Sequence, residues 1–83
     1  MQTVLITGAS AGFGKLVAEK LLAKGYTVYA AARRVEKMRD LESLGAHIMH
    51  MDVTDTESVN AGVAKVIEEQ HRIDVLFNNA GYG

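Results

Sequence analysis

The sequence predicts an α/β fold in which four parallel strands form a sheet and three helices cover its faces. Two features lead to this prediction. Short apolar segments rich in β-branched residues alternate with longer segments whose apolar residues recur every three or four positions. A glycine-rich turn joins the first of these strands to the first helix. Strands connected through helices run parallel, so the chain is expected to form half of a doubly wound sheet.

The strands and helices can be placed by their apolar patterns and by the residues that bound them. Strands are expected at residues 1–7, 26–31, 47–51 and 73–77. Helices are expected at residues 13–24 and 35–44 and from residue 55 onward. Phe13 and Val17 lie on the apolar face of the first helix, and Gly25 is placed to end it. Thr54 is expected to cap the third helix, with Glu57 completing a capping box.

Size and composition limit the kinds of protein this can be. The 83 residues are enough for one small domain, and a formal charge of −1 gives no basic field for nucleic acid. The absence of cysteine removes disulfides and thiolate metal sites and suits a cytoplasmic protein. No apolar run approaches the roughly 18 residues that a membrane span needs. His47 and His50 would point to opposite faces of one strand, so no metal site is expected.

The last expected strand raises the question of what lies beside it. Val75, Leu76 and Phe77 are apolar at consecutive positions, so both faces of this strand need cover. Such a strand usually lies inside a sheet, and no later strand in this sequence could pair with its free edge. Either a second chain covers it, or residues 1–83 are a truncated part of a longer protein. We favour the longer protein.

The turn after the first strand reads Thr7-Gly8-Ala9-Ser10-Ala11-Gly12-Phe13-Gly14. It leaves backbone N–H groups unpaired at a helix N-terminus, where the helix dipole favours an anion. Glycines also let a phosphate approach where a Cβ would block it. Three glycines in seven positions are more than a simple connection requires. We therefore interpret the turn as a cradle for a nucleotide phosphate, with a tight turn that binds nothing as the alternative.

Two other functional interpretations of this turn fit less well. A P-loop has four residues between its first glycine and Gly-Lys, followed by Ser or Thr. Here five residues separate Gly8 from Gly14-Lys15, and Leu16 follows. A hydrolase nucleophile elbow would use Ser10 as the nucleophile, within a G-x-S-x-G pattern. That fold takes an oxyanion-hole donor from a loop after an earlier strand, and only seven residues precede Gly8. Dinucleotide binding is the best of the three interpretations.

Three short motifs occur in order along the chain. They are the turn T-G-x-x-x-G-x-G at Thr7–Gly14, the pair Asp52-Val53 after the third strand, and Asn78-Asn79-Ala80-Gly81 after the fourth. Together they resemble the cofactor motif, the adenine-contacting pair and the N-N-A-G motif of the classical short-chain dehydrogenase/reductase family. This resemblance covers essentially the whole chain. It implies a Rossmann fold, a nicotinamide dinucleotide as cofactor, and oxidation or reduction of an alcohol or carbonyl group.

The end of the second strand distinguishes NADP(H) from NAD(H). An NAD-binding protein has an acidic residue roughly 20 positions after the glycines, where it binds the ribose 2′-hydroxyl. Here that position is Ala32, and Arg33 and Arg34 follow. A guanidinium group attracts the 2′-phosphate that a carboxylate would repel. Some family members have a basic residue inside the turn instead, but that position is Ala11 here. We therefore predict NADP(H), with Arg33 as the main reader and Arg34 as a helper; a solvated arginine pair is the alternative.

The predicted site binds a cofactor but contains no catalytic residue. Cofactor contacts are expected at Gly8, Ser10, Gly12, Phe13, Gly14, Arg33, Arg34, Asp52, Val53, Asn79, Ala80 and Gly81. The resemblance implies a catalytic Tyr-x-x-x-Lys downstream, and Tyr26, Tyr29 and Tyr82 each lack a lysine four residues later. Residues 1–83 would then be a partial dinucleotide-binding domain, the NADP(H)-binding N-terminal portion of an oxidoreductase that forms homo-oligomers. The alternative is a free-standing nucleotide-binding module that associates with itself through its fourth strand.

Overall fold

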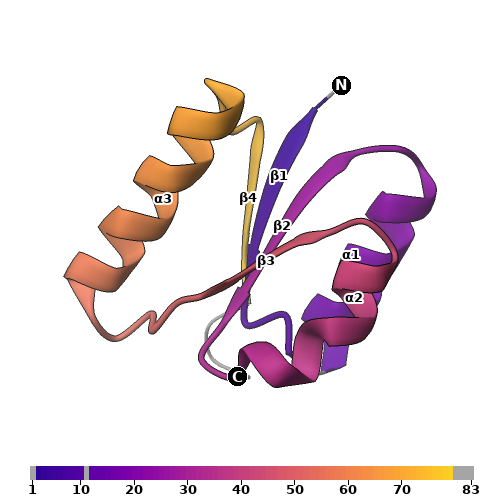
Figure 1. Cartoon of the computed structure of the whole chain (residues 1–83), viewed down its shortest axis with the longest axis horizontal. Helices are drawn as coiled ribbons and strands as arrows, with labels where there is room; N and C mark the ends of the chain where they lie inside the picture. The colour runs from indigo at the N-terminus through magenta and orange to yellow at the C-terminus, as the bar shows by residue number, and fades with distance from the viewer. Residues whose placement is uncertain (1, 11, 80–83) are drawn as a thin grey trace.

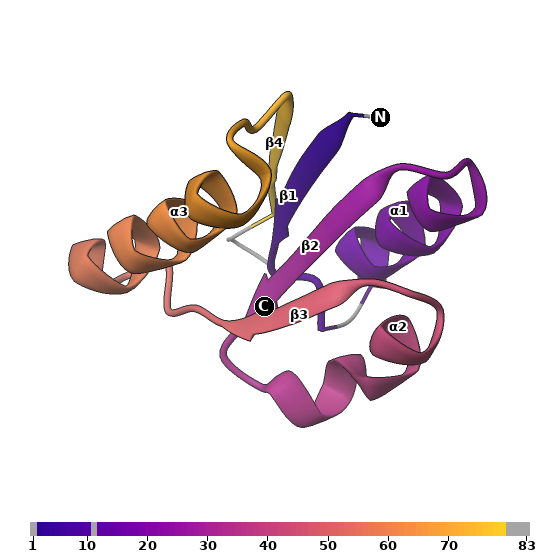
Figure 2. The ribbon, with the colours of Figure 1, turned by 45° about the horizontal axis from the view of Figure 1, so that its top comes forward.

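The computed structural model describes residues 2–10 and 12–79, and its elements follow the predicted order. The elements are β1 (Thr3–Thr7), α1 (Gly12–Ala23), β2 (Thr27–Ala32), a 3-10 turn η1 (Val35–Met38), α2 (Arg39–Ser43), β3 (His47–His50), α3 (Thr56–Gln70) and β4 (Val75–Asn78). All paired strands are parallel, in the spatial order β3-β2-β1-β4. Helices α1 and α2 cover one face of the sheet and α3 covers the other (Figures 1 and 2). The predicted Rossmann-type α/β fold is confirmed.

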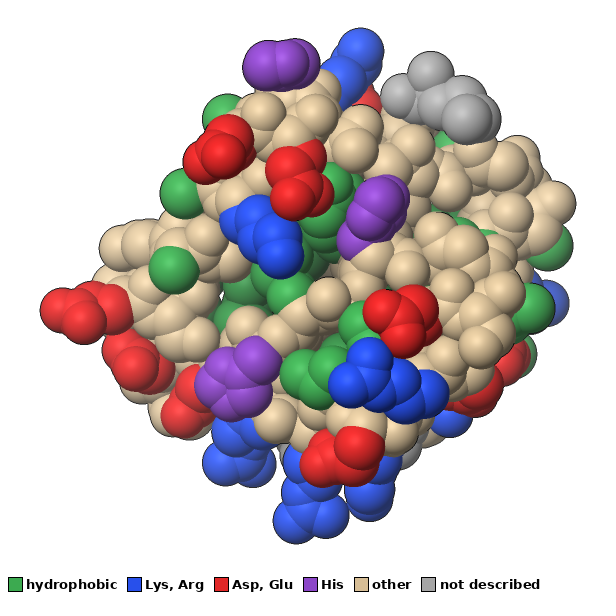
Figure 3. Space-filling model, viewed as in Figure 1, with side chains coloured by type: hydrophobic (Ala, Val, Ile, Leu, Met, Phe, Trp, Pro, Cys, Tyr) green, Lys and Arg blue, Asp and Glu red, His purple; other side chains and the backbone are tan. Residues whose placement is uncertain are grey.

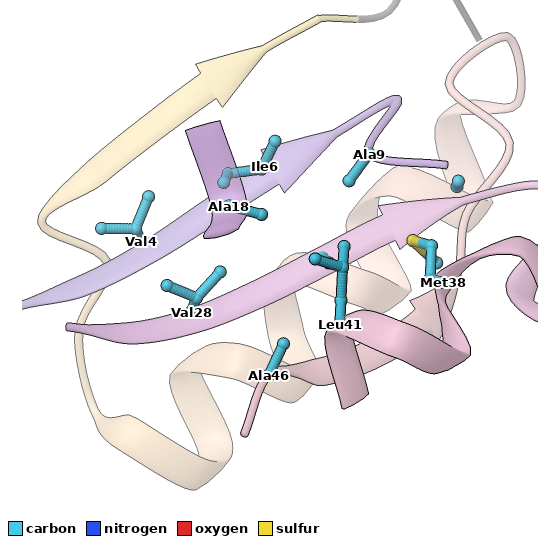
Figure 4. Packing of buried hydrophobic residues seen from close by; sticks show 10 residues of the cluster. Val4, Ile6, Ala9, Ala18, Val28, Met38, Leu41 and Ala46 are labelled. Atoms are coloured by element: carbon cyan, nitrogen blue, oxygen red, sulfur yellow. The ribbon is translucent and has the colours of Figure 1, made fainter. Parts of the chain in front are cut away.

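The central strand β1 supplies side chains to a core on each face of the sheet. All five of its residues are buried. Val4 and Ile6 lie in the core beneath α1 and α2, together with Met38 and Leu41 (Figure 4). Leu5 lies in the core beneath α3. Because successive strand residues point to opposite faces, an unbroken apolar run fits a strand that is covered on both sides.

Helix α1 packs on the sheet through small residues, which differs from the apolar stripe predicted for it. Its buried residues are Gly14 and Ala18, while Val17 is only partly buried. The predicted inward position of Phe13 is wrong, because this side chain is 63% exposed. Its ring lies against Phe77 instead, with the ring centroids 5.9 Å apart. Gly14 and Ala18 lack bulky side chains, so the helix approaches the strands closely and turns Phe13 outward.

The predicted second helix is divided into two short pieces. The turn η1 ends at Met38 and α2 begins at Arg39. Met38 and Leu41 are fully buried, but Leu44 is 59% exposed and lies just beyond the helix. The apolar spacing of three residues fits a 3-10 turn better than an extended α-helix, since side chains three positions apart align there. Sequence periodicity found the buried residues but overestimated the length of the helix.

The cap of α3 is Asp55, so the prediction that Thr54 caps this helix is wrong. The Asp55 side chain accepts a hydrogen bond from the Glu57 N–H at 3.0 Å. Thr54 instead donates its hydroxyl to Asp52 Oδ1 at 2.6 Å, and its N–H bonds to the same oxygen at 3.0 Å. Aspartate caps helices as well as threonine does. Thr54 is therefore hydrogen-bonded to Asp52 in a local turn, and Asp55 serves as the N-cap of α3.

Strand β4 forms one edge of the sheet and is exposed on part of its surface. Val75 is 44% exposed and Leu76 is 59% exposed. The start of the strand is attached firmly to β1, because the Thr3 N–H donates to Asp74 Oδ2 at 2.7 Å and the Asp74 N–H donates to the Thr3 carbonyl at 2.9 Å.

None of the helices among the described residues has the length and apolar character that a membrane span requires.

Replacing Asp74 with Asn is expected to lower the melting temperature at neutral pH and to flatten its dependence on pH below about 4. Arg72, followed by the Thr3 N–H, holds the pKa of the Asp74 carboxyl below its ordinary value of 3.8. A carboxyl with a lowered folded pKa stabilises the fold fully above its unfolded pKa, and this stabilisation is lost as pH falls through the folded pKa. Thermal melts of both proteins between pH 2 and 7 measure the effect. Parallel curves for the two proteins would contradict a stabilising role for this carboxylate.

Candidate functional site

A cleft of about 350 Å³ opens where β1, β2 and β3 end. Its lining residues are Gly8, Ser10, Ala32, Arg33, Arg34, Lys37, Met51, Asp52, Val53 and Thr54. Six of these are predicted cofactor contacts from three separate segments: Gly8, Ser10, Arg33, Arg34, Asp52 and Val53. Parallel strands bring their carboxyl ends to one edge of a sheet, and α/β proteins bind ligands in the crevice there. The fold therefore brings together residues up to about 45 positions apart in the sequence.

The glycine turn leads from β1 to the first turn of α1. Gly8 has φ of +66° and Gly12 has φ of +62°, a backbone conformation that residues with a Cβ rarely adopt. The Ala9 N–H donates to the Ala31 carbonyl at 3.2 Å, which holds the turn against the end of β2. A Cβ at Gly12 would meet no atom within 4 Å. The start of α1 is therefore open to a ligand on the side of Gly12.

Asn79 explains the other two glycines of the turn. A Cβ at Gly8 would collide with the Asn79 carbonyl oxygen, and a Cβ at Gly14 would lie 2.7 Å from Asn79 Nδ2. Asn79 is only 5% exposed, and its Nδ2 donates to the Gly8 carbonyl at 3.3 Å. The sequence suggested that these glycines make room for a phosphate. The structure adds a second reason, which is the close packing of the turn against the residue after β4.

Thr7 joins the glycine turn to the end of β4. Its hydroxyl donates to Asn78 Oδ1 at 3.0 Å and accepts from the Asn79 N–H at 3.1 Å. These bonds connect the carboxyl ends of β1 and β4, the pair of neighbouring strands where the order along the sheet reverses. The two asparagines therefore fix the shape of the turn. Ala80 and Gly81, which are also predicted cofactor contacts, lie outside the described residues.

Three exposed cations line the cleft beside β2. Arg33 and Arg34 follow the strand directly, and Lys37 lies in η1, three residues after Arg34. Figure 3 shows several Lys and Arg side chains projecting from the lower edge of the molecule, the edge at which β1 and β2 end in Figure 1. Among the described residues, Arg34 and Lys37 form no side-chain hydrogen bond or ion pair with another residue. Their charges remain available to an anion in the cleft.

Sequence reasoning missed Lys37 as a member of this group. The signal was present, because a basic residue three positions after Arg34 lies on the same side of a helical turn. Thr54 was also missed, since it was interpreted as a helix cap. Its hydroxyl is the main cause that holds the pKa of Asp52 below the ordinary value, with smaller contributions from Arg33 and His50. The cleft thus contains one ionised carboxylate beside three cations.

Three other residues have positions that bear on the alternative interpretations. Phe13 is exposed at the start of α1 and does not line the cleft, so its contact with a cofactor stays a prediction. Ser10 lines the cleft, but within the described residues no hydrogen bond joins it to a histidine or an acidic side chain. Tyr29 lies in the core on the α3 side, where its hydroxyl bonds to Glu69 and Gln70. Burial is the main cause of its raised pKa. Among the described residues, the surroundings of Ser10 give no support to the nucleophile elbow, and Tyr29 lies in the core and does not line the cleft.

Comparisons with known proteins identify the family to which the chain is similar. The family model described as short chain dehydrogenase matches residues 2–83. A 3-ketodihydrosphingosine reductase from Bacteroides thetaiotaomicron is 45% identical over 83 residues, which cover 99% of this chain and 29% of the relative. A protein from Dichelobacter nodosus, named as a probable NADP-dependent dehydrogenase in the aabA 3′ region, is 43% identical over 81 residues, covering 94% of this chain and 76% of the relative.

A solved structure shows the same fold. The short-chain dehydrogenase from Streptomyces avermitilis superposes with a TM-score of 0.90 at 42% identity, over 94% of this chain and 30% of that chain. The present chain therefore spans less than a third of the Bacteroides and Streptomyces proteins. The match of the family model, the identity to these relatives and the common fold lead to one conclusion. The chain belongs to the short-chain dehydrogenase family.

Proposed function

We propose that this chain is the NADP(H)-binding N-terminal portion of an oxidoreductase that acts on an alcohol or carbonyl substrate. The observation that supports the cofactor most strongly is the group of Arg33, Arg34 and Lys37 in one cleft with the glycine turn. A phosphate dianion matches these cations, whereas the 2′-hydroxyl of NAD(H) would leave them without a partner. The name of the Dichelobacter relative, which states NADP dependence, points in the same direction.

The residues of the cleft fit the three parts of the dinucleotide. The pyrophosphate would lie at the first turn of α1, where Gly12 presents no side chain and the helix dipole favours an anion. The 2′-phosphate would lie against Arg33, and the adenine would lie near Asp52 and Val53. Asp52 stays ionised at neutral pH, so its carboxylate can accept a hydrogen bond from an amino group. In this arrangement the dinucleotide would lie across the carboxyl ends of the strands.

The bound nicotinamide would supply or accept the hydride of the reaction. The residues that line the cleft would bind and orient the cofactor. Asn79 fixes the turn on which the cofactor would rest. We assign proton transfer and substrate selection to other parts of a longer protein, as the resemblance to the short-chain dehydrogenase/reductase family implies. A cytoplasmic location stays a prediction based on the absence of cysteine.

A free-standing nucleotide-binding module is the second candidate, and the surface of β4 favours it. Among the described residues, β4 has a neighbouring strand on one side only, and its residues Val75 and Leu76 are exposed. An apolar edge strand can pair with a second copy of the same chain. This candidate predicts that the 83-residue chain forms a dimer or larger species that binds NADPH without catalysing turnover. Size-exclusion chromatography combined with an NADPH titration measures both properties.

The proposed function is tested by cofactor binding and by turnover, both measured on the longer protein that contains residues 1–83. Titrations with NADPH and NADH under identical salt conditions are expected to give at least about tenfold tighter binding of NADPH, the difference that one charge-assisted contact provides. The absorbance of the reduced nicotinamide, followed with a panel of ketones, aldehydes and alcohols, measures turnover. Equal affinity for both cofactors would contradict the NADP(H) assignment. Tight binding with no turnover on any substrate would favour the second candidate.

A further inference from the structure

Lys15 connects α1 to the segment that carries the cations of the cleft. Its Nζ lies 2.8 Å from Asp40 Oδ2 and donates to the carbonyl oxygen of Lys37 at 3.3 Å. The Lys15 side chain is 28% exposed, whereas the basic partners of the other two described ion pairs are at least 60% exposed. A single ammonium group therefore holds both the end of η1 and the start of α2, from the first turn of the neighbouring helix.

The turn η1 has little internal support. Arg34 is its N-cap residue and makes no side-chain capping bond. The hydrogen bond from the Lys37 N–H to the Arg34 carbonyl, at 3.1 Å, closes this single 3-10 turn. Such turns have poorer hydrogen-bond geometry than α-helices. Met38 anchors the turn in the core, and Lys15 holds it from the side of α1. The directions in which Arg34 and Lys37 leave the backbone depend on this turn.

The place of Lys15 in α1 also calls for an explanation. A cation in the first turn of a helix is disfavoured by the helix dipole, and α1 has no acidic residue in its first turn. Asp40 offsets this charge, and Lys15 in turn is the main cause that holds the pKa of Asp40 below its ordinary value. Lys15 directly follows Gly14, which packs against Asn79. The pair thus joins the turn expected to face the pyrophosphate to the turn expected to face the 2′-phosphate.

We propose that Lys15 and Asp40 are positioning residues, which hold η1 so that Arg34 and Lys37 face the 2′-phosphate and thereby strengthen the preference for NADP(H). This inference depends on the proposed function of the cleft. Neither residue lines the cleft itself. Their effect is therefore on the placement of other cations, and it acts on the part of the ligand that NADH lacks.

Two substitutions test the proposal in the protein that contains this chain, one that removes a positive charge and one that removes a negative charge. Lys15→Met removes the ammonium group, and Asp40→Asn removes its partner but keeps the positive charge. Each is expected to raise the Kd of NADPH about two- to fivefold, the range of an exposed ion pair, and to leave the Kd of NADH unchanged. Lys15→Arg, which can still bind Asp40, is expected to restore NADPH binding. Far-UV circular dichroism confirms that each variant is folded.

Glu42→Gln is the matched control, because it breaks the exposed pair of Arg39 and Glu42 within α2, which does not reach α1. It is expected to leave both Kd values unchanged. If Lys15 attracted the pyrophosphate directly, Lys15→Met would weaken NADPH and NADH equally and Asp40→Asn would strengthen both, which would overturn the proposal. If Arg33→Ala selectively lost affinity for NADPH while the Lys15 and Asp40 variants kept it, this inference alone would be overturned. A wild-type protein that does not prefer NADPH would overturn the proposed function, and this inference with it.

Discussion

Gly8→Ala is expected to lower the free energy of unfolding by about 2–4 kcal/mol, through steric overpacking together with backbone strain. The new Cβ would collide with the carbonyl oxygen of Asn79. The residue also has φ of +66°, which alanine adopts only with strain. Relief would require the end of β4 to move away from β1, which would strain the bonds from Thr7 to Asn78 and Asn79. Urea denaturation followed by circular dichroism measures the loss.

Gly12→Ala is the matched control for this prediction. It has nearly the same φ, +62°, but a Cβ there meets no atom within 4 Å. The strain of placing alanine at this positive φ alone predicts a loss of about 1 kcal/mol in the free energy of unfolding. NADPH binding is expected to weaken, because the added methyl group occupies the open side of the first turn of α1. If Gly8→Ala and Gly12→Ala destabilised the protein equally, the close packing against Asn79 would not be the reason for Gly8.

Arg33→Ala is expected to weaken NADPH binding by about 1.5–3 kcal/mol, the usual contribution of a hydrogen bond to a charged group. This corresponds to a rise in Kd of roughly ten- to 150-fold. NADH has no 2′-phosphate, so its affinity should change little. Arg33 lies at the end of β2 in the same cleft as Ser10 and Asp52. Isothermal titration with each cofactor at fixed ionic strength gives the two affinities directly.

Arg39→Ala controls for the loss of a positive charge alone. Arg39 is an exposed arginine, with 64% of its side chain accessible, and its partner is Glu42 rather than a residue of the cleft. It is expected to leave both cofactor affinities unchanged. An equal loss of NADPH and NADH affinity in Arg33→Ala would show that Arg33 acts on a group common to both cofactors. That result would remove the basis for choosing NADP(H).

The fold could be predicted from the sequence because its signals are local and repeated. The apolar run in β1, the glycine turn and Gly25 after α1 each mark a boundary through elementary backbone chemistry. Helix α1 shows where this reasoning fails. Apolar spacing placed Phe13 inside, but the packing of Gly14 against Asn79 decides which face of the helix meets the sheet. That contact joins residues 65 positions apart, so no local pattern reports it.

Residues of the candidate site could be predicted where their position in a sequence motif indicates their role. Residues whose role depends on the folded arrangement were missed. Arg33 and Asp52 could be chosen because they lie one and two residues after the ends of β2 and β3, and strand ends meet at one edge of the sheet. The spacing of Lys37 from Arg34 was a sequence signal, but its place in the cleft follows from the 3-10 turn that η1 forms. In the sequence, Thr54 satisfies the rule for a helix cap as well as Asp55 does. In the structure the Thr54 hydroxyl donates to Asp52, and Asp55 caps the helix instead.

A crystal structure of the protein with NADP⁺ tests the central claim most directly. We predict that the 2′-phosphate lies within hydrogen-bond distance of Arg33, in the cleft that Ser10 and Lys37 border. The pyrophosphate is predicted to lie at the first turn of α1, on the open side of Gly12. A 2′-phosphate directed into solvent away from Arg33, or a dinucleotide bound at another part of the molecule, would contradict the assignment of this cleft as an NADP(H) site.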